Sequence, residues 1–210
     1  MKCYVFDLDN TLMPTSALFG SPRARQLLRH RRDGAAGKAQ DAIVHAYRRI
    51  IAPDPQLISL IASLSGQKVL LTNGTRLHGY AALTALGLRP YFYGQVDRDS
   101  GAPMKPALPI YRLLQDHVNT HVRHRRRAGI TYVFFDDLLE NLIVPKQLGW
   151  TTVWISGASR PPTPRLAHVD YAFANIYDGL RFFQAAQAAQ EAQAAQEARA
   201  THRRHAKPRA

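Results

Sequence analysis

Six short apolar runs divide the 210-residue chain, and most of the segments between them have helical periodicity. Leu57, Leu60 and Ile61, for example, recur at the spacing of one helix face, as do Ile110 and Leu114. Strands that alternate with helices favour a parallel sheet covered on both faces, so the sequence predicts an α/β fold. The expected strands are Cys3–Phe6, Lys68–Leu71, Tyr91–Val96, Thr131–Phe135, Thr151–Ile155 and Tyr171–Phe173.

Two stretches interrupt this alternation. Residues 15–52 contain no strand pattern but two helical candidates, Pro22–Arg32 and Lys38–Ile51. Pro53 and Pro55 end this insertion, because a residue before proline is disfavoured in a helix. The end of the chain is an Ala/Gln-rich run without large apolar side chains, which could be helical by propensity but has nothing to bury. We therefore expect a core of residues 1–14 and 53–183, a small helical insertion at 15–52, and a basic, disordered tail at 184–210.

The composition suits a protein with one hydrophobic core that lies in a reducing compartment and does not span a membrane. Apolar residues make up 46% of the chain, which is enough for one hydrophobic core. The single cysteine, Cys3, excludes an intramolecular disulfide and points to a reducing compartment. No run approaches the roughly 18 apolar residues of a membrane span, and Met1 leads directly into a strand rather than a signal peptide. We expect a cytoplasmic protein, with a nuclear location as the alternative that basic clusters suggest, and either a monomer or a homodimer.

The net charge of +13 is concentrated in clusters rather than spread along the chain. Such clusters suit an anionic partner, such as nucleic acid, a nucleotide or an acidic surface. The alternative is an Arg-rich surface that only contacts water. The clusters are Arg23, Arg25, Arg29, Arg31 and Arg32; Arg123, Arg125, Arg126 and Arg127; and Arg203, Arg204, Lys207 and Arg209 in the tail.

Two carboxylates, Asp7 and Asp9, follow the first apolar run with one residue between them. Alternate residues of a strand point the same way, so these side chains are expected to lie side by side and to raise one another's pKa. A site that tolerates this arrangement holds a cation, performs acid/base chemistry, or does both.

Further polar residues follow the other expected strands, where a parallel α/β sheet binds its ligands. Because the carboxyl ends of these strands share one edge, the side chains should converge there. Oxygen donors without a His/Cys cluster favour Mg²⁺ over zinc, and a lysine beside them suits phosphate. The set comprises Thr72, Asn73 and Gly74 after the second strand, Lys105 after the third, and Asp136, Asp137 and Asn141 after the fourth.

Each of these residues also has a purely structural interpretation. Asp9 with Asn10 can form an Asx turn, and Asp136 with Asp137 can cap the next helix. The Thr72 segment can be an ordinary turn between a strand and a helix, and Lys105 an exposed lysine. Their common position at strand ends nevertheless favours one shared site.

The motifs DLDNTL, LLTNG, MKP and FFDDLLEN, in this order, resemble the four motifs of the haloacid dehalogenase superfamily, whose phosphatases carry an Asp-x-Asp first motif. The resemblance covers the chain from Lys2 to about Phe183. TNGTRLHGYAALTALGL and FFDDLLENLIVPKQLGWTTVWI are most similar to the pyrimidine 5′-nucleotidase branch. The resemblance to the superfamily implies a Rossmann-like core and a helical cap inserted after the first strand.

The resemblance also implies a mechanism. Asp7 would attack phosphorus and form an aspartyl-phosphate. Asp9 would protonate the leaving oxygen and then activate water. Lys105 would offset charge on the transferring group, while the Thr72 hydroxyl and the Asn73 backbone N–H would bind the phosphoryl oxygens.

By the same resemblance, Mg²⁺ would be held by the Asp7 carboxylate, the Asp9 main-chain carbonyl and Asp137, with help from Asp136. Asn141 would support these ligands. Dehalogenases of the superfamily lack an acid/base at the second aspartate, because halide leaves without a proton. Asp9 therefore favours phosphoester hydrolysis.

The substrate is less constrained. The branch resemblance implies a small phosphorylated substrate, a nucleoside 5′-monophosphate. The insertion of about forty residues is short for that branch, which would admit larger substrates, and Ala107 replaces the polar residue that often follows Lys-Pro. Two alternatives are a nucleic-acid end phosphatase that uses the Arg clusters, and a basic nucleic-acid-binding protein on an inactive core.

Overall fold

The computed structural model describes residues 1–18, 40–122, 129–157 and 166–205. These residues form a six-stranded sheet in the order β3-β2-β1-β4-β5-β6, and all paired strands are parallel. The predicted α/β fold is therefore confirmed, and the strands lie close to the apolar runs. Their bounds are β1 Lys2–Phe6, β2 Gln67–Leu71, β3 Gly94–Val96, β4 Thr131–Asp136, β5 Thr151–Ile155 and β6 Tyr171–Phe173.

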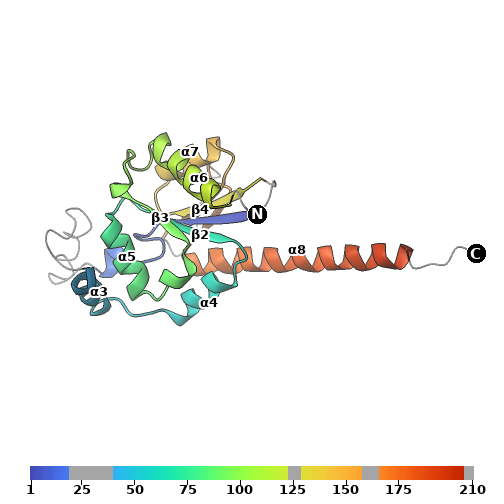
Figure 1. The fold of residues 1–210 in the computed structure, drawn as a ribbon, viewed down its shortest axis with the longest axis horizontal. Coiled ribbons are helices and arrows are strands. Elements are labelled where there is room, and N and C mark those ends of the chain that lie inside the picture. Colours follow the sequence, from blue (N-terminus) through green and yellow to red (C-terminus); the bar gives the residue numbers. More distant parts are fainter. Residues whose placement is uncertain (19–39, 123–128, 158–165, 206–210) are drawn as a thin grey trace, which may run out of the picture.

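Helices cover both faces of the sheet (Figure 1). Helices α6 and α7 pack on one face, and α3, α4, α5 and the first turns of α8 pack on the other. Two short helical turns, η1 and η2, flank β3. The helices are α1 Thr15–Leu18, α3 Gln40–Arg48, α4 Pro55–Ser63, α5 Arg76–Ala85, η1 Arg89–Tyr91, η2 Arg98–Ser100, α6 Leu108–Val122, α7 Glu140–Gln147 and α8 Ile176–His205.

The central strands are continuously apolar because both of their faces are buried. In β1, Tyr4 and Phe6 point into the core under α3, α4, α5 and α8, whereas Cys3 and Val5 point into the core under α6 and α7. All four side chains have no exposed surface. An unbroken apolar run, rather than an alternating one, is the pattern of such a strand.

The register brings the carboxyl ends of the strands to one edge. Phe6 of β1 is paired with Leu70 of β2 and Phe135 of β4. The chain continues this pairing for one more residue, since the backbone N–H of Asp7 donates to the carbonyl of Phe135 at 2.9 Å. The residues that follow these strands therefore emerge side by side.

Local signals fix the helix boundaries near this edge. Thr75 precedes α5, and its side chain accepts a hydrogen bond from the backbone N–H of His78. Asp54 precedes α4 and accepts from two backbone N–H groups, which satisfies donors that have no partner within the helix. Gly87 and Gly149 adopt positive φ angles of 76° and 78° after α5 and α7, as helix ends often require.

The predicted insertion at 15–52 contains α1 and α3 in the structure. Helix α3 corresponds to the candidate Lys38–Ile51, while the candidate Pro22–Arg32 lies outside the described residues. The Arg23–Arg32 and Arg123–Arg127 clusters also lie outside, as do the side chains of the basic cluster in the tail.

The end of the chain differs from the predicted disordered tail. Helix α8 runs without a break from Ile176 to His205, so the expected boundary at residue 184 falls inside it. Figure 1 shows this helix extending well past the rest of the molecule. Its first turns are nucleated by buried Ile176, Leu180 and Phe183, and alanine and glutamine then continue it because of their helix propensity.

Two glutamines tie the middle of α8 to the core. Gln187 accepts from the backbone N–H of Ser65 at 2.8 Å and donates to the Ser65 hydroxyl at 2.8 Å. The Lys2 ammonium donates to Gln190 at 3.1 Å. No helix among the described residues is both long and apolar enough to cross a membrane.

Candidate active site

A buried lysine joins two strand ends at the carboxyl edge of the sheet. The ammonium of Lys105 lies 2.7 Å from Asp7 Oδ1 and 2.6 Å from Asp136 Oδ2. Asp7 follows β1, Asp136 ends β4, and Lys105 comes from the loop between η2 and α6. All three side chains are at least nine-tenths buried, so these ion pairs are shielded from water and from salt.

Asp7, Asp136 and Asp137 form a compact acidic group, with one oxygen of each lying within 4.8 Å of the others. The second oxygen of Asp136, Oδ1, accepts hydrogen bonds of 2.9 Å from the Asn141 amide and from the Leu138 N–H. Because all the donor atoms are oxygens, this group fits a hard divalent cation such as Mg²⁺ better than zinc.

Burial raises the pKa values of this acidic group. The pKa of Asp7 rises to about 6, since loss of hydration and the charges of Asp9 and Asp137 outweigh the opposing effect of Lys105. Burial also raises the pKa values of Asp136 and Asp137 to about 6, with added repulsion from Asp7 and Asp136, respectively. A cation among these carboxylates would offset both the burial and the repulsion.

The pKa of Lys105 moves in the opposite sense to that of an isolated buried lysine. Burial alone lowers it, but the carboxylates of Asp136 and Asp7 raise it above its usual range. The lysine is therefore a fixed positive charge at any ordinary pH.

Asp9 is held separately from the acidic group. Its Oδ1 accepts a hydrogen bond of 2.7 Å from the Thr15 hydroxyl, and both of its oxygens lie 3.2 Å from Nε2 of His78. The sequence predicted that Asp7 and Asp9 would lie side by side as strand neighbours, but β1 ends at Phe6. Both aspartates therefore lie on the following loop, close enough for the charge of Asp9 to raise the pKa of Asp7.

The residues after β2 have contacts that the sequence did not indicate. The Asn73 side chain clamps the main chain of Lys105: it accepts from the Lys105 N–H at 2.9 Å and donates to the Lys105 carbonyl at 3.0 Å. The hydroxyl of Thr72 accepts from the backbone N–H of Gly74 at 3.0 Å. Asn73 thus fixes the loop that carries the lysine, in addition to any contact with a ligand.

Sequence reasoning missed four residues of this site. Thr15 and His78 contact Asp9, a hydrogen bond from the Asn10 side chain lowers the pKa of Asp137, and Tyr47 contacts His78. For His78 a signal existed, because it is polar on the otherwise apolar face of Ala81, Ala82 and Ala85 in α5. No such signal existed for Tyr47, because Tyr47 lies on α3 and contacts His78 on α5.

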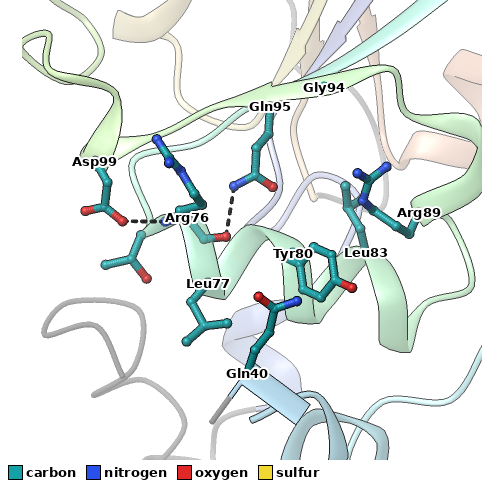
Figure 2. A pocket seen from close by; sticks show the side chains of 10 residues that line it. Gln40, Arg76, Leu77, Tyr80, Leu83, Arg89, Gly94, Gln95 and Asp99 are labelled. Atoms are coloured by element: carbon teal, nitrogen blue, oxygen red, sulfur yellow. Dashed lines mark hydrogen bonds between the residues drawn. The ribbon is translucent and has the colours of Figure 1, made fainter. Parts of the chain in front are cut away.

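A pocket of about 470 Å³ lies on the outer side of α5 (Figure 2). Its walls come from four parts of the chain: helix α5, the segment that runs from η1 to β3, the turn η2, and the start of α3. None of the catalytic, phosphate-binding or metal-binding residues predicted from the sequence lines it. The lining residues are Gln40, Thr75, Arg76, Leu77, Tyr80, Leu83, Arg89, Gly94, Gln95 and Asp99.

The chain matches no family model and no curated protein, but its fold matches solved structures. L-2-haloacid dehalogenase from Xanthobacter autotrophicus is 16% identical, with 86% of this chain and 97% of that chain covered at a TM-score of 0.57. A HAD phosphatase from Thermococcus onnurineus is 20% identical, with 87% of this chain and 97% of that chain covered at a TM-score of 0.56.

A third match is the magnesium-bound Bacillus subtilis protein YfnB, at 17% identity, with 87% of this chain and 98% of that chain covered at a TM-score of 0.54. Identities this low establish a common fold and leave the chemistry to be argued from the site. The chain has the α/β fold of the haloacid dehalogenase superfamily.

Proposed function

We propose that the protein is a Mg²⁺-dependent phosphomonoester hydrolase that acts through an aspartyl-phosphate. The observation that carries this proposal is the separation of two aspartates only two residues apart. Asp7 lies among Lys105, Asp136 and Asp137, whereas Asp9 is held outside that group by Thr15 and His78. A nucleophile and an acid/base need such different surroundings.

Asp7 is the nucleophile. Its carboxylate oxygen forms a bond to phosphorus while the bond from phosphorus to the leaving oxygen breaks, which gives an aspartyl-phosphate and an alcohol. Water then attacks the aspartyl-phosphate, restoring the carboxylate and releasing inorganic phosphate. A pKa of about 6 leaves Asp7 mostly ionised at neutral pH, and Lys105 offsets negative charge on the transferring group.

Asp9 supplies the proton that the leaving oxygen takes up in the first step, and accepts a proton from water in the second. This role separates the proposal from dehalogenation, which is one of the activities named among the structural matches. A halide leaves without a proton, so a dehalogenase gains nothing from an acid at this position. A positioned Asp9 supports an alkoxide leaving group.

The acidic group fits Mg²⁺, and a structural match is magnesium-bound. We assign Asp7, Asp137 and the main-chain carbonyl of Asp9 as its ligands, with Asp136 supporting both the cation and Lys105. When bound, Mg²⁺ supplies a positive charge that stabilises the phosphoryl oxygens as negative charge develops. Asn73 keeps Lys105 in place, and the Thr72 hydroxyl and the Asn73 N–H contact the phosphoryl oxygens.

We expect the metal-free protein to lose stability as the pH rises from about 4 to 6. The pKa values of Asp7, Asp136 and Asp137 rise from 3.8 to about 6 on folding, so in this window the folded state binds more protons than the unfolded state. Above pH 6 the loss is complete, and Mg²⁺ at 100-fold its Kd should restore about 2.7 kcal/mol, or roughly 5–10 °C in Tm.

Thermal melts at pH 5 and 7.5, with and without Mg²⁺, measure this effect. The gain from Mg²⁺ should be larger at pH 7.5, where the carboxylates are ionised. Asp137→Asn is the matched control, because it removes one ligand charge at nearly constant volume. An equal gain in the wild type and in Asp137→Asn would rule out this metal site.

For the substrate we propose a nucleoside 5′-monophosphate, with a preference for pyrimidines. The likeness of the motifs after Thr72 and Asp136 to the pyrimidine 5′-nucleotidase branch supports this. The net charge of +13 favours a second candidate, hydrolysis of phosphate from nucleic-acid ends. An inactive binding protein is less favoured, because it would have no use for the buried contacts of Lys105 with Asp7 and Asp136.

Salt dependence distinguishes the two substrates. A mononucleotide makes few phosphate contacts, so its KM should change little between about 50 and 200 mM salt. An oligonucleotide that neutralises 6–10 charges would lose roughly 10³–10⁵-fold in affinity over that range. We expect phosphate release from mononucleotides with a shallow salt slope. Faster release from end-phosphorylated oligonucleotides, with a steep slope that disappears when the Arg clusters are neutralised, would favour the second candidate.

A further inference from the structure

A buried histidine links Asp9 to the inserted helix α3. His78 has no exposed surface. Its Nε2 lies 3.2 Å from each carboxylate oxygen of Asp9, and its Nδ1 lies 2.6 Å from the hydroxyl of Tyr47 on α3. The three side chains thus form a continuous buried chain from the insertion to the proposed acid/base.

The imidazole is fixed by the backbone around it. A Cβ added at Gly74 would lie 2.4 Å from Cδ2 of His78, so only glycine at this turn leaves room for the ring. The backbone N–H of His78 also donates to Thr75, the residue that caps α5. With Tyr47 at one ring nitrogen and Asp9 at the other, these contacts hold the imidazole against Asp9.

The hydrogen bond between His78 and Asp9 depends on which of the two carries the hydrogen. When Asp9 has given up its proton, its carboxylate only accepts hydrogen bonds, and Nε2 of His78 is then the donor; when Asp9 carries the proton, it can donate to Nε2 instead. With the Thr15 hydroxyl, the imidazole holds the carboxylate from two directions. Loss of His78 would leave Asp9 with the freedom to turn about its side-chain bonds.

We propose that His78 is the positioning residue for Asp9 and that Tyr47 holds the imidazole, so that packing of α3 on α5 sets the place of the acid/base. The inference rests on the proposed function, in which Asp9 transfers the proton. It assigns a task to α3 beyond covering the core, because the site is complete only when Tyr47 reaches His78.

His78→Leu tests this directly, because leucine fills a similar volume and donates no hydrogen bond. We expect kcat for an alkyl phosphate to fall about 10²-fold, the size of effect that a misplacement of about 1 Å can cause. KM should stay nearly constant. With an aryl phosphate such as p-nitrophenyl phosphate, whose leaving group needs no proton, the first step, measured as the initial release of phenolate, should slow by less than about threefold.

His78→Gln provides the rescue, because its side-chain NH₂ can reach the position of Nε2 and donate to Asp9. Its kcat for the alkyl phosphate should exceed that of His78→Leu by about tenfold. Equal losses in both variants, or equal losses in the first step of both phosphates, would mean that His78 only fills the core and would overturn the proposal.

Tyr47→Phe should give a smaller loss with the same preference for the alkyl phosphate. Tyr177→Phe is the matched control, since it removes a hydroxyl bonded to Asp54, the residue before α4, rather than to His78. In an Asp9→Asn background, His78→Leu should change kcat by less than about threefold, because residues that act as a unit are not additive. Additive losses would contradict the positioning role.

Crystal structures separate this inference from the proposed function. If the wild type released no phosphate from any substrate, the proposed function would fail, yet the position of Asp9 could still be compared. The inference predicts that the Asp9 carboxylate turns away in His78→Leu and keeps its place in His78→Gln. An unmoved Asp9 in His78→Leu would refute it whatever the activity.

Discussion

Asp7→Asn is expected to reduce phosphate release by about 10⁴-fold or more, the scale on which enzymes lose a nucleophile. The amide cannot form the aspartyl-phosphate. The fold should survive, because asparagine has nearly the same shape and Lys105 keeps its contact with Asp136. Phosphate release and a thermal melt on the same preparation measure both effects.

Stability at pH 7.5 should even rise slightly in metal-free Asp7→Asn. The substitution removes a carboxylate whose pKa is raised to about 6 by burial and by its acidic neighbours. Asp41→Asn is the matched control, since Asp41 is exposed on α3, and it should behave as the wild type. Turnover of Asp7→Asn within a few-fold of the wild type would exclude Asp7 as the nucleophile.

Asp9→Asn should divide substrates by their leaving groups. Alkyl phosphates need a proton on the departing oxygen, so their kcat should fall by about 10²–10⁴-fold, the usual contribution of a general acid. Aryl phosphates leave as stable phenolates, and their first step should be little affected. A plot of log kcat against leaving-group pKa is therefore expected to be steeper in Asp9→Asn than in the wild type.

One complication is the second step, in which the same Asp9 activates water. If the aspartyl-phosphate then accumulates, an initial burst of phenolate should precede slow turnover, and stopped-flow measurement detects it. Equal losses on both kinds of phosphate without a burst would argue against Asp9 as the acid.

The convergence of distant residues could be predicted because it follows from topology. Parallel strands share their carboxyl edge, so Asp7, Lys105 and Asp136 had to approach one another once the strands were recognised. The apolar runs of β1 and β4 are strong signals because both faces of these strands are buried. Because all parallel strands share that edge, the acidic group could be expected without knowing the order of the strands in the sheet.

Contacts between separate elements could not be predicted. Asn73 has the right position to contact a ligand, but its clamp on the Lys105 main chain depends on how two loops approach in space. The pairing of Tyr47 with His78 likewise depends on how α3 lies on α5. The Ala/Gln run after residue 184 has the propensity to be helical, but nothing in it indicates that it continues the helix begun by buried Ile176, Leu180 and Phe183.

The length of α8 has a practical consequence. At 1.5 Å per residue, its 30 residues span about 45 Å, and Figure 1 shows most of that length beyond the body of the molecule. A fluorophore or a surface linker attached at the exposed Ala198 would therefore stand clear of the sheet and of α3. Such a handle would allow single-molecule observation of the enzyme while leaving access to Asp7 open.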